Sequence, residues 1–258
     1  MIYIVKHKPY NNRVPNGYAE LYVGDMEKTI KESKTANELP EKYPIMSNGG
    51  NKDLNPLQDK TLTKQDPSAP EPLIETEPTI NHLNPYLNEV TALYDIWKNK
   101  KDEIVGMCHY RRFLKFGNGI LPFDKASEMI GDGGRIIVSK EEGNGCSCHD
   151  YCKREYGGEA FDKYFKMMYV LDQEAAKWFR TSTKFFSKEM FVCRKKDMDK
   201  FCAPLFKIIV PMAERFRKED GGKPRVNKRL IGYMTERLFG YFISKSGLKV
   251  EKLNWMWV

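Results

Sequence analysis

Short apolar runs alternate with longer amphipathic stretches along this chain of 258 residues. The short runs predict strands over residues 2–5, 104–108, 131–139 and 188–195. The longer stretches repeat apolar residues at helical spacing and predict helices over 84–99, 159–180, 197–212 and 227–247. Strands that alternate with helices are typical of an α/β domain, and this length suits a single domain over 1–258.

The helix expected over residues 84–99 has the clearest pattern. Asn84 suits the N-cap and Pro85 suits the first helical position. One apolar stripe is then formed by Leu87, Val90, Tyr94 and Trp97. The buried strand 104–108 follows after a short basic turn, which predicts one continuous helix, one turn and one strand.

Prolines and glycines punctuate the rest of the chain. Between about residues 25 and 79 the prolines exclude long helices and central strands, so we expect a long polar insertion, either a binding lid or a plain floppy loop. Asp197 is expected to cap the third helix, and Pro204 and Pro211 to kink or shorten it. Gly247 is expected to end the last helix.

The chain carries a net charge of +8, which favours anionic partners. Its basic residues are spread along the sequence without a recognised RNA or DNA module, so nucleic acid is not an expected partner. The sequence shows no signal peptide and no apolar run long enough to span a bilayer. We therefore expect a cytoplasmic protein, with peripheral contact at the inner face of the membrane left open.

A basic cluster directly follows the buried strand 104–108. His109, Tyr110, Arg111 and Arg112 stand where that strand ends, and His7 and Lys8 follow the first strand. Ligands of α/β proteins bind at the carboxyl ends of strands, and guanidinium groups pair bidentately with phosphate oxygens. The cluster predicts a diphosphate site; ordinary strand-end salt bridges are the alternative.

The segments NPYLNEVTALYDIWKN and IVGMCHYRRFL together resemble a family of capsular and exopolysaccharide biosynthesis proteins, classed as a domain of unknown function. IYIVKHKPY, EMFVCRKKDMDKFCAPLF and RLIGYMTERLFGYFI match further segments of that family. The resemblance implies a GT-A-like nucleotide-diphospho-sugar transferase fold. In such a fold a mixed central sheet is flanked by helices, with a helical C-terminal part.

The same resemblance implies a hexosyltransferase. It would move galactose or galactofuranose from a nucleoside-diphosphate sugar, a UDP-sugar first, to a growing capsular polysaccharide, exopolysaccharide or lipid-linked saccharide. Similar enzymes hold Mn²⁺ with an acidic pair at the end of this strand, where the present chain has His109-Tyr110-Arg111-Arg112. We expect these cations to offset the charge of the leaving diphosphate, with no metal or other cofactor predicted and a divalent metal left open as the alternative.

Further site residues follow from the matched segments. Glu89 corresponds to a family glutamate and is expected to contact sugar hydroxyls or the base. Arg229, Glu236 and Arg237 match a late R…ER segment, with Glu236 on the catalytic side and the arginines binding sugar or acceptor. Their alternative is an exposed charged helix face.

Two positions depart from the family pattern. Glu189 replaces an asparagine and is a candidate general base for an inverting transfer. Asp95 replaces a tryptophan, which alters packing or donor choice. These departures support a second hypothesis, a non-catalytic, degenerate sugar-nucleotide-binding module.

A compact cysteine cluster is the last candidate for chemistry. Cys146, Cys148, His149 and Cys152 offer zinc-type ligands, but only in a single group, so reduced cysteines are favoured. A zinc-dependent nucleic-acid binder is the third hypothesis. The ending NWMWV is expected to form a core-packing strand rather than to insert into a membrane.

Overall fold

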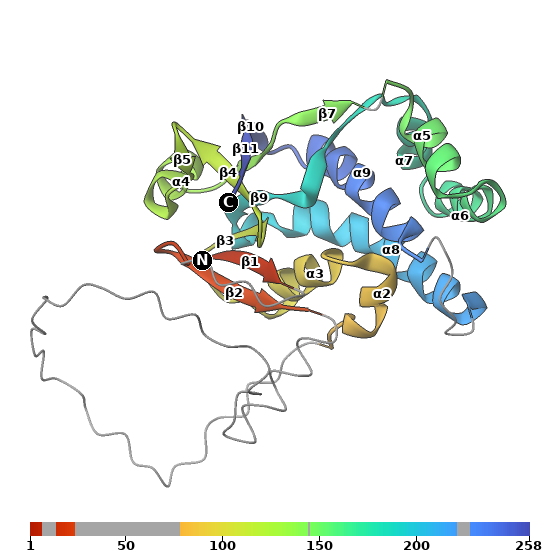
Figure 1. The fold of residues 1–258 in the computed structure, drawn as a ribbon, viewed down its shortest axis with the longest axis horizontal. Coiled ribbons are helices and arrows are strands. Elements are labelled where there is room, and N and C mark those ends of the chain that lie inside the picture. Colours follow the sequence, from red (N-terminus) through yellow and green to blue (C-terminus); the bar gives the residue numbers. More distant parts are fainter. Residues whose placement is uncertain (7–13, 24–77, 144, 221–227) are drawn as a thin grey trace, which may run out of the picture.

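A mixed β-sheet forms the centre of the molecule (Figure 1). The computed structural model describes residues 1–6, 14–23, 78–143, 145–220 and 228–258. Along the main path of the sheet the strands run in the order β10-β6-β9-β3-β1-β2. Their bounds, in that order, are Lys249–Leu253, Arg135–Ser139, Phe191–Arg194, Ile104–His109, Ile2–Lys6 and Tyr18–Tyr22.

On this path β9 runs in the direction opposite to the other strands. β1 is parallel to both β2 and β3, and β10 is parallel to β6. β9 is antiparallel to both of its neighbours, β3 and β6. The α/β class and the mixed central sheet expected from the sequence are therefore confirmed.

Smaller strands extend the sheet beyond the end of β3. β4 (Arg112–Phe116) pairs with β3, with β5 (Gly119–Ile120) and with β11 (Trp255–Trp257). A separate two-stranded sheet joins β7 (Glu141–Gly143) to β8 (Lys184–Phe186). The strand expected in NWMWV is present and packs on the core in part: Trp255 is half-buried against apolar core residues, whereas Trp257 is 57% exposed.

Helices cover the sheet and complete two apolar cores (Figure 1). The larger core joins alternate residues of β1 and β3 to the long helices α8 (Asp199–Asp220) and α9 (Leu230–Lys245). The smaller core joins the opposite faces of the same strands to β4 and α4 (Phe123–Ile130). Tyr3 and Val5 enter the larger core while Ile2 and Ile4 enter the smaller one, so β1 is buried on both faces.

Eight shorter helical elements complete the described part of the fold. They are η1, α2, α3, α5, α6, α7, η2 and η3, with the bounds Asn81–Leu83, Asn84–Leu87, Val90–Asn99, Cys148–Tyr156, Gly158–Leu171, Gln173–Thr181, Ser187–Glu189 and Lys195–Asp197. β7 and α5 occupy the stretch from residue 140 to 160, for which the sequence pattern predicts no element.

Two predicted helices are each divided in the structure. The helix expected over 84–99 is wrong as one element, because Asn88 has a positive φ of 53° and separates α2 from α3. The helix expected over 159–180 ends at Leu171, where Asp172 adopts an extended conformation. The Asp172 carboxylate then caps α7 by accepting a hydrogen bond of 2.9 Å from Ala175 N.

Two other expectations near residue 197 are also wrong. α8 runs unbroken for 22 residues, although it contains Pro204 and Pro211, because its apolar face is buried along its length. Asp197 lies before α8 and accepts a hydrogen bond of 2.8 Å from Gly134 N instead of capping the helix. The strand expected over 188–195 begins only at Phe191.

Other expectations fall outside what the structure describes. Most of the polar insertion expected over residues 25–79 lies there, as do His7 and Lys8. Gly247 has a positive φ of 72° just after α9, as expected of a helix stop. Within the described ranges, none of the helices has the length and apolar character needed to cross a bilayer.

Close packing of β3 against β9 depends on Gly106, and Gly106→Ala tests this. An added Cβ would lie 2.6 Å from the Phe191 carbonyl oxygen and 3.0 Å from Val192 Cγ2. We expect a loss of about 1–3 kcal/mol in the free energy of unfolding, measured by urea denaturation. Gly119→Ala is the control, because nothing lies within 4 Å of its added Cβ. Equal stability of both variants would contradict this packing.

Candidate functional site

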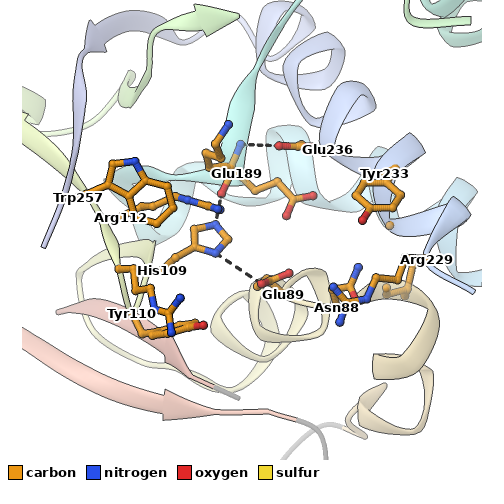
Figure 2. Close-up of a pocket in the computed structure, with 14 residues that line it drawn as sticks. Asn88, Glu89, His109, Tyr110, Arg112, Glu189, Arg229, Tyr233, Glu236 and Trp257 are labelled. Atoms are coloured by element: carbon orange, nitrogen blue, oxygen red, sulfur yellow. Dashed lines mark hydrogen bonds and ion pairs between the residues drawn. The ribbon is translucent and has the colours of Figure 1, made fainter. Parts of the chain in front are cut away.

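A cavity of about 340 Å³ opens where β3 ends (Figure 2). Val5 of β1 is in register with His109, so the parallel strands β1 and β3 leave the sheet at this same edge. Small-molecule sites of α/β proteins lie at such edges and occupy upwards of about 300 Å³. The walls come from the α2–α3 junction, β3 and the start of β4, η2, α9 and β11.

The break between α2 and α3 brings Glu89 into this cavity. The Asn88 carbonyl oxygen accepts hydrogen bonds from Asn84 Nδ2 at 2.9 Å and from Thr91 Oγ1 at 2.8 Å, which fixes the turn. Gly232 of α9 makes room for it, because a Cβ there would lie 2.8 Å from Asn88 Nδ2. Glu89 Oε1 then lies 3.6 Å from His109 Nδ1.

A second unusual turn forms the opposite wall. Lys188 and Glu189 both have a positive φ, 67° and 53°, which costs of order 1–3 kcal/mol for each non-glycine residue. Lys188 N donates a hydrogen bond of 2.8 Å to Glu236 Oε1, and the Lys188 carbonyl accepts one from His109 Nε2. The Lys188 ammonium group also pairs with Glu142 at 2.9 Å. The turn is therefore held at its backbone and at its side chain.

This turn places a carboxyl group in a poorly hydrated position. Glu189 is 5% exposed, and its Oε1 has no hydrogen-bond partner within the described part of the chain. Burial raises the pKa of Glu189 well above its ordinary value, and the neighbouring carboxylates of Glu236 and Glu89 raise it further, against an opposing effect of Arg237. The neutral form of Glu189 is therefore favoured.

Arg111 and Arg112 supply positive charge on the β4 side of the cavity. Arg111 lies over the Tyr110 ring at 4.8 Å, and Arg112 lies over the Trp257 ring at 4.6 Å. Neither guanidinium forms an ion pair with a described carboxylate, and Arg112 Nε is buried without a hydrogen-bond partner there. The described residues thus do not form the salt bridges considered as the alternative role.

Most of the site residues expected from the sequence lie around this one cavity. They are Glu89, His109, Tyr110, Arg111, Arg112, Glu189, Arg229 and Glu236. Arg237, which we expected to bind the sugar or the acceptor, does not line the cavity. Its guanidinium is buried between the Tyr151 and Phe185 rings, at 4.8 and 4.6 Å, and donates a hydrogen bond to the Tyr233 carbonyl.

Several cavity residues were not expected from the sequence: Asn88, Lys188, Tyr233 and Trp257. Tyr233 stacks on Tyr156 of α5, with ring centroids 4.1 Å apart. The paired tryptophans of NWMWV could have pointed to Trp257 as a site residue, but we assigned that segment to the core. No sequence pattern points to Asn88 or Lys188 as site residues, because their backbone conformations depend in part on contacts with α9 and β3.

The cysteine cluster lies apart from this site. Cys148 and Cys152 are buried in α5, and burial raises the pKa of these thiols to about 11 and about 12. The His149 ring packs edge-on against Phe161 and Phe165, with centroids 5.0 and 4.6 Å away. In the described ranges, no three His, Cys, Asp or Glu side chains are grouped in a way that could hold a metal ion.

The fold and the site define an α/β protein with a charged small-molecule cavity at the edge of its sheet. The chain belongs to the family DUF4422, a domain of unknown function, whose model matches residues 75–247. This match confirms that the chain belongs to a domain family of unknown function, as the resemblance of the C-H-Y-R-R segment predicts.

A solved structure shares the fold. The apo structure of WbbM, a bifunctional glycosyltransferase, is similar with a TM-score of 0.66 and 21% sequence identity. The match covers 100% of this chain and 45% of that one, so this chain spans less than half of its length. Curated proteins gave no match to the sequence.

Burial of Glu189 makes its effect on stability depend on pH. Because its pKa is raised in the folded state, stability falls as pH rises above the ordinary value of 4.5 and the unfolded chain loses its proton first. Glu189→Gln keeps a neutral side chain at every pH. We expect it to raise Tm by several degrees at pH about 8, since each kcal/mol is worth about 2–4 °C.

Thermal unfolding at two pH values checks this prediction. At pH about 4 the gain should nearly vanish, because Glu189 is then protonated in both states. Glu128→Gln, at an exposed position paired with Lys125, is the control and should show no such dependence. An equal effect of Glu189→Gln at both pH values would contradict a buried, neutral Glu189.

Proposed function

We propose that this protein is a glycosyltransferase of GT-A-like architecture. It would transfer a hexose, galactose or galactofuranose first, from a UDP-sugar to a growing capsular polysaccharide, exopolysaccharide or lipid-linked saccharide. The observation that carries the proposal is one cavity at the β1–β3 edge that contains two arginines without carboxylate partners among the described residues and one buried carboxyl group. The similarity to a bifunctional glycosyltransferase supports the same class.

Arg111 and Arg112 would bind the diphosphate of the donor. Their guanidinium groups are steadied by the Tyr110 and Trp257 rings, while their hydrogen-bonding edges are not used by described carboxylates. Negative charge grows on the diphosphate as the glycosyl–phosphate bond breaks. Fixed cations stabilise that charge most when they are already in position, so the arginines would do what a metal ion does in similar enzymes.

Glu189 would act as the general base. In its ionised form it takes the proton of an acceptor hydroxyl, whose oxygen forms a bond with the anomeric carbon of the donor. The bond from that carbon to the phosphate oxygen breaks, and the diphosphate leaves with the electron pair. Burial raises the pKa of Glu189 above its ordinary value, which is the direction that makes a carboxylate a stronger base once it is ionised.

The other cavity residues would position these groups and the sugar. Both ring nitrogens of His109 face protein groups, the Lys188 carbonyl and Glu89, so we assign His109 to positioning rather than to the diphosphate. Glu236 holds Lys188 N and is likewise a positioning residue. Glu89 and Arg229 would contact hydroxyl groups of the sugar or the acceptor, as the family resemblance implies.

The neutral state of Glu189 also fits a second function, a sugar-nucleotide-binding module without catalysis. A protonated carboxyl group would donate a hydrogen bond to a bound sugar instead of accepting a proton. Donor hydrolysis or transfer by the purified protein distinguishes an enzyme from such a module.

Removal of either cavity arginine tests the diphosphate assignment. We first select a donor by thermal stabilisation with a panel of sugar nucleotides, with and without Mn²⁺. Arg111→Ala and Arg112→Ala should each then weaken donor binding in calorimetry and lower transfer by about 10²–10³-fold, as for other preorganised charge-stabilising donors. Arg154→Ala, at an exposed site paired with Glu155, is the control. Unchanged donor binding in both cavity variants would contradict the assignment.

A further inference from the structure

Trp257 presents an unusually exposed ring at the edge of the cavity (Figure 2). Its side chain is 57% exposed although it lies in the short strand β11, paired with β4. No catalytic role fits an indole ring here, because it has neither an ionisable group nor an acceptor atom. Its contribution to a ligand is apolar contact through the ring face, with Nε1–H as a single hydrogen-bond donor.

The Trp257 ring is held in place and stays exposed, although the Arg112 guanidinium lies over one of its faces. It is in register with Arg112 across the antiparallel β11–β4 pair, and the Arg112 guanidinium lies over the ring at 4.6 Å. Trp255 contacts it edge-on, with centroids 5.7 Å apart, and is itself anchored by a hydrogen bond of 3.0 Å from its Nε1 to Glu142. A rigid, exposed ring loses little conformational freedom when a ligand stacks on it.

Trp257 lies next to Arg112, the arginine assigned to the diphosphate, on the antiparallel side of the site. Nucleotides bind where parallel strands end, here at β1 and β3, whereas Trp257 belongs to the antiparallel extension formed by β4 and β11. In Figure 2, Trp257 lies across the cavity from Tyr233 and Arg229. Glu189 and Glu236 are near the cavity wall between these two sides.

We propose that Trp257 is the stacking platform for a hexose ring, a role that rests on the proposed glycosyltransferase function. A hexopyranose has an apolar face of C–H groups that packs on an indole, while its hydroxyl groups need polar partners. Trp257 provides the apolar surface, and the carboxyl and guanidinium groups across the cavity provide the polar partners. The hexose is that of the donor or of the acceptor, which share this chemistry.

Calorimetry with three probes tests the platform and separates the two sources of hexose. The probes are UDP, UDP-galactose and methyl β-galactopyranoside, each titrated into the native protein, Trp257→Ala and Trp257→Phe. If the donor hexose stacks on Trp257, Trp257→Ala should weaken UDP-galactose by roughly ten-fold more than it weakens UDP, whose binding changes only through the lost contact with Arg112. If the acceptor hexose stacks there, Trp257→Ala should weaken the methyl galactoside, and UDP and UDP-galactose should change by one and the same factor. Trp257→Phe should retain most of the affinity in either case.

A matched control accounts for loss of an exposed aromatic side chain. Phe116→Ala removes a 40% exposed ring from the paired strand β4, outside the cavity, and should change none of the three affinities. Equal weakening of UDP and UDP-galactose by Trp257→Ala, with the methyl galactoside unchanged, would overturn the proposal, because the ring would then support only the base or Arg112. Unchanged affinities for all probes would also overturn it. Absence of UDP and UDP-galactose binding by the native protein would instead count against the proposed function itself.

Discussion

The hydrogen bond from Lys188 N to Glu236 Oε1 holds the backbone turn on which the site depends. A positive φ is unfavourable for the two successive non-glycine residues Lys188 and Glu189. This hydrogen bond and the one from His109 Nε2 to the Lys188 carbonyl stabilise that conformation. The turn directs Glu189 into a buried position beside two other carboxylates. The turn therefore brings α9, β3 and the start of β9 together in one site. By burying Glu189, it also raises the pKa of that carboxyl group.

A second backbone break serves the facing wall. Asn88 ends α2 early, and Gly232 on α9 allows the close approach that this requires. Helix α9 therefore supports both walls, through Gly232 on one side and Glu236 on the other. Because the same helix fixes both turns, the distance between Glu89 and Glu189 depends on the packing of α9 against the sheet.

The sequence predicts the site better than it predicts the backbone that forms it. Strand 104–108 and the basic residues after it follow from local patterns, since a buried strand and a charged edge differ sharply in composition. The turn at Lys188 does not, because residues more than 40 positions away hold it. The break at Asn88 does not either, because it needs the space left by Gly232, although its own hydrogen bonds are local. Arg237 resembles a site residue in sequence but packs between two rings, which only the fold reveals.

The most direct test of this account is the pH dependence of hexose transfer by the native protein and Glu189→Gln, using the donor that binds. A base with a raised pKa predicts a rate that climbs as pH rises through that pKa and then levels, because only the ionised carboxylate accepts a proton. Glu189→Gln should fold normally, bind the donor and lose transfer by at least about 10²-fold. Transfer by Glu189→Gln at the native rate, with the native pH profile, would contradict the account.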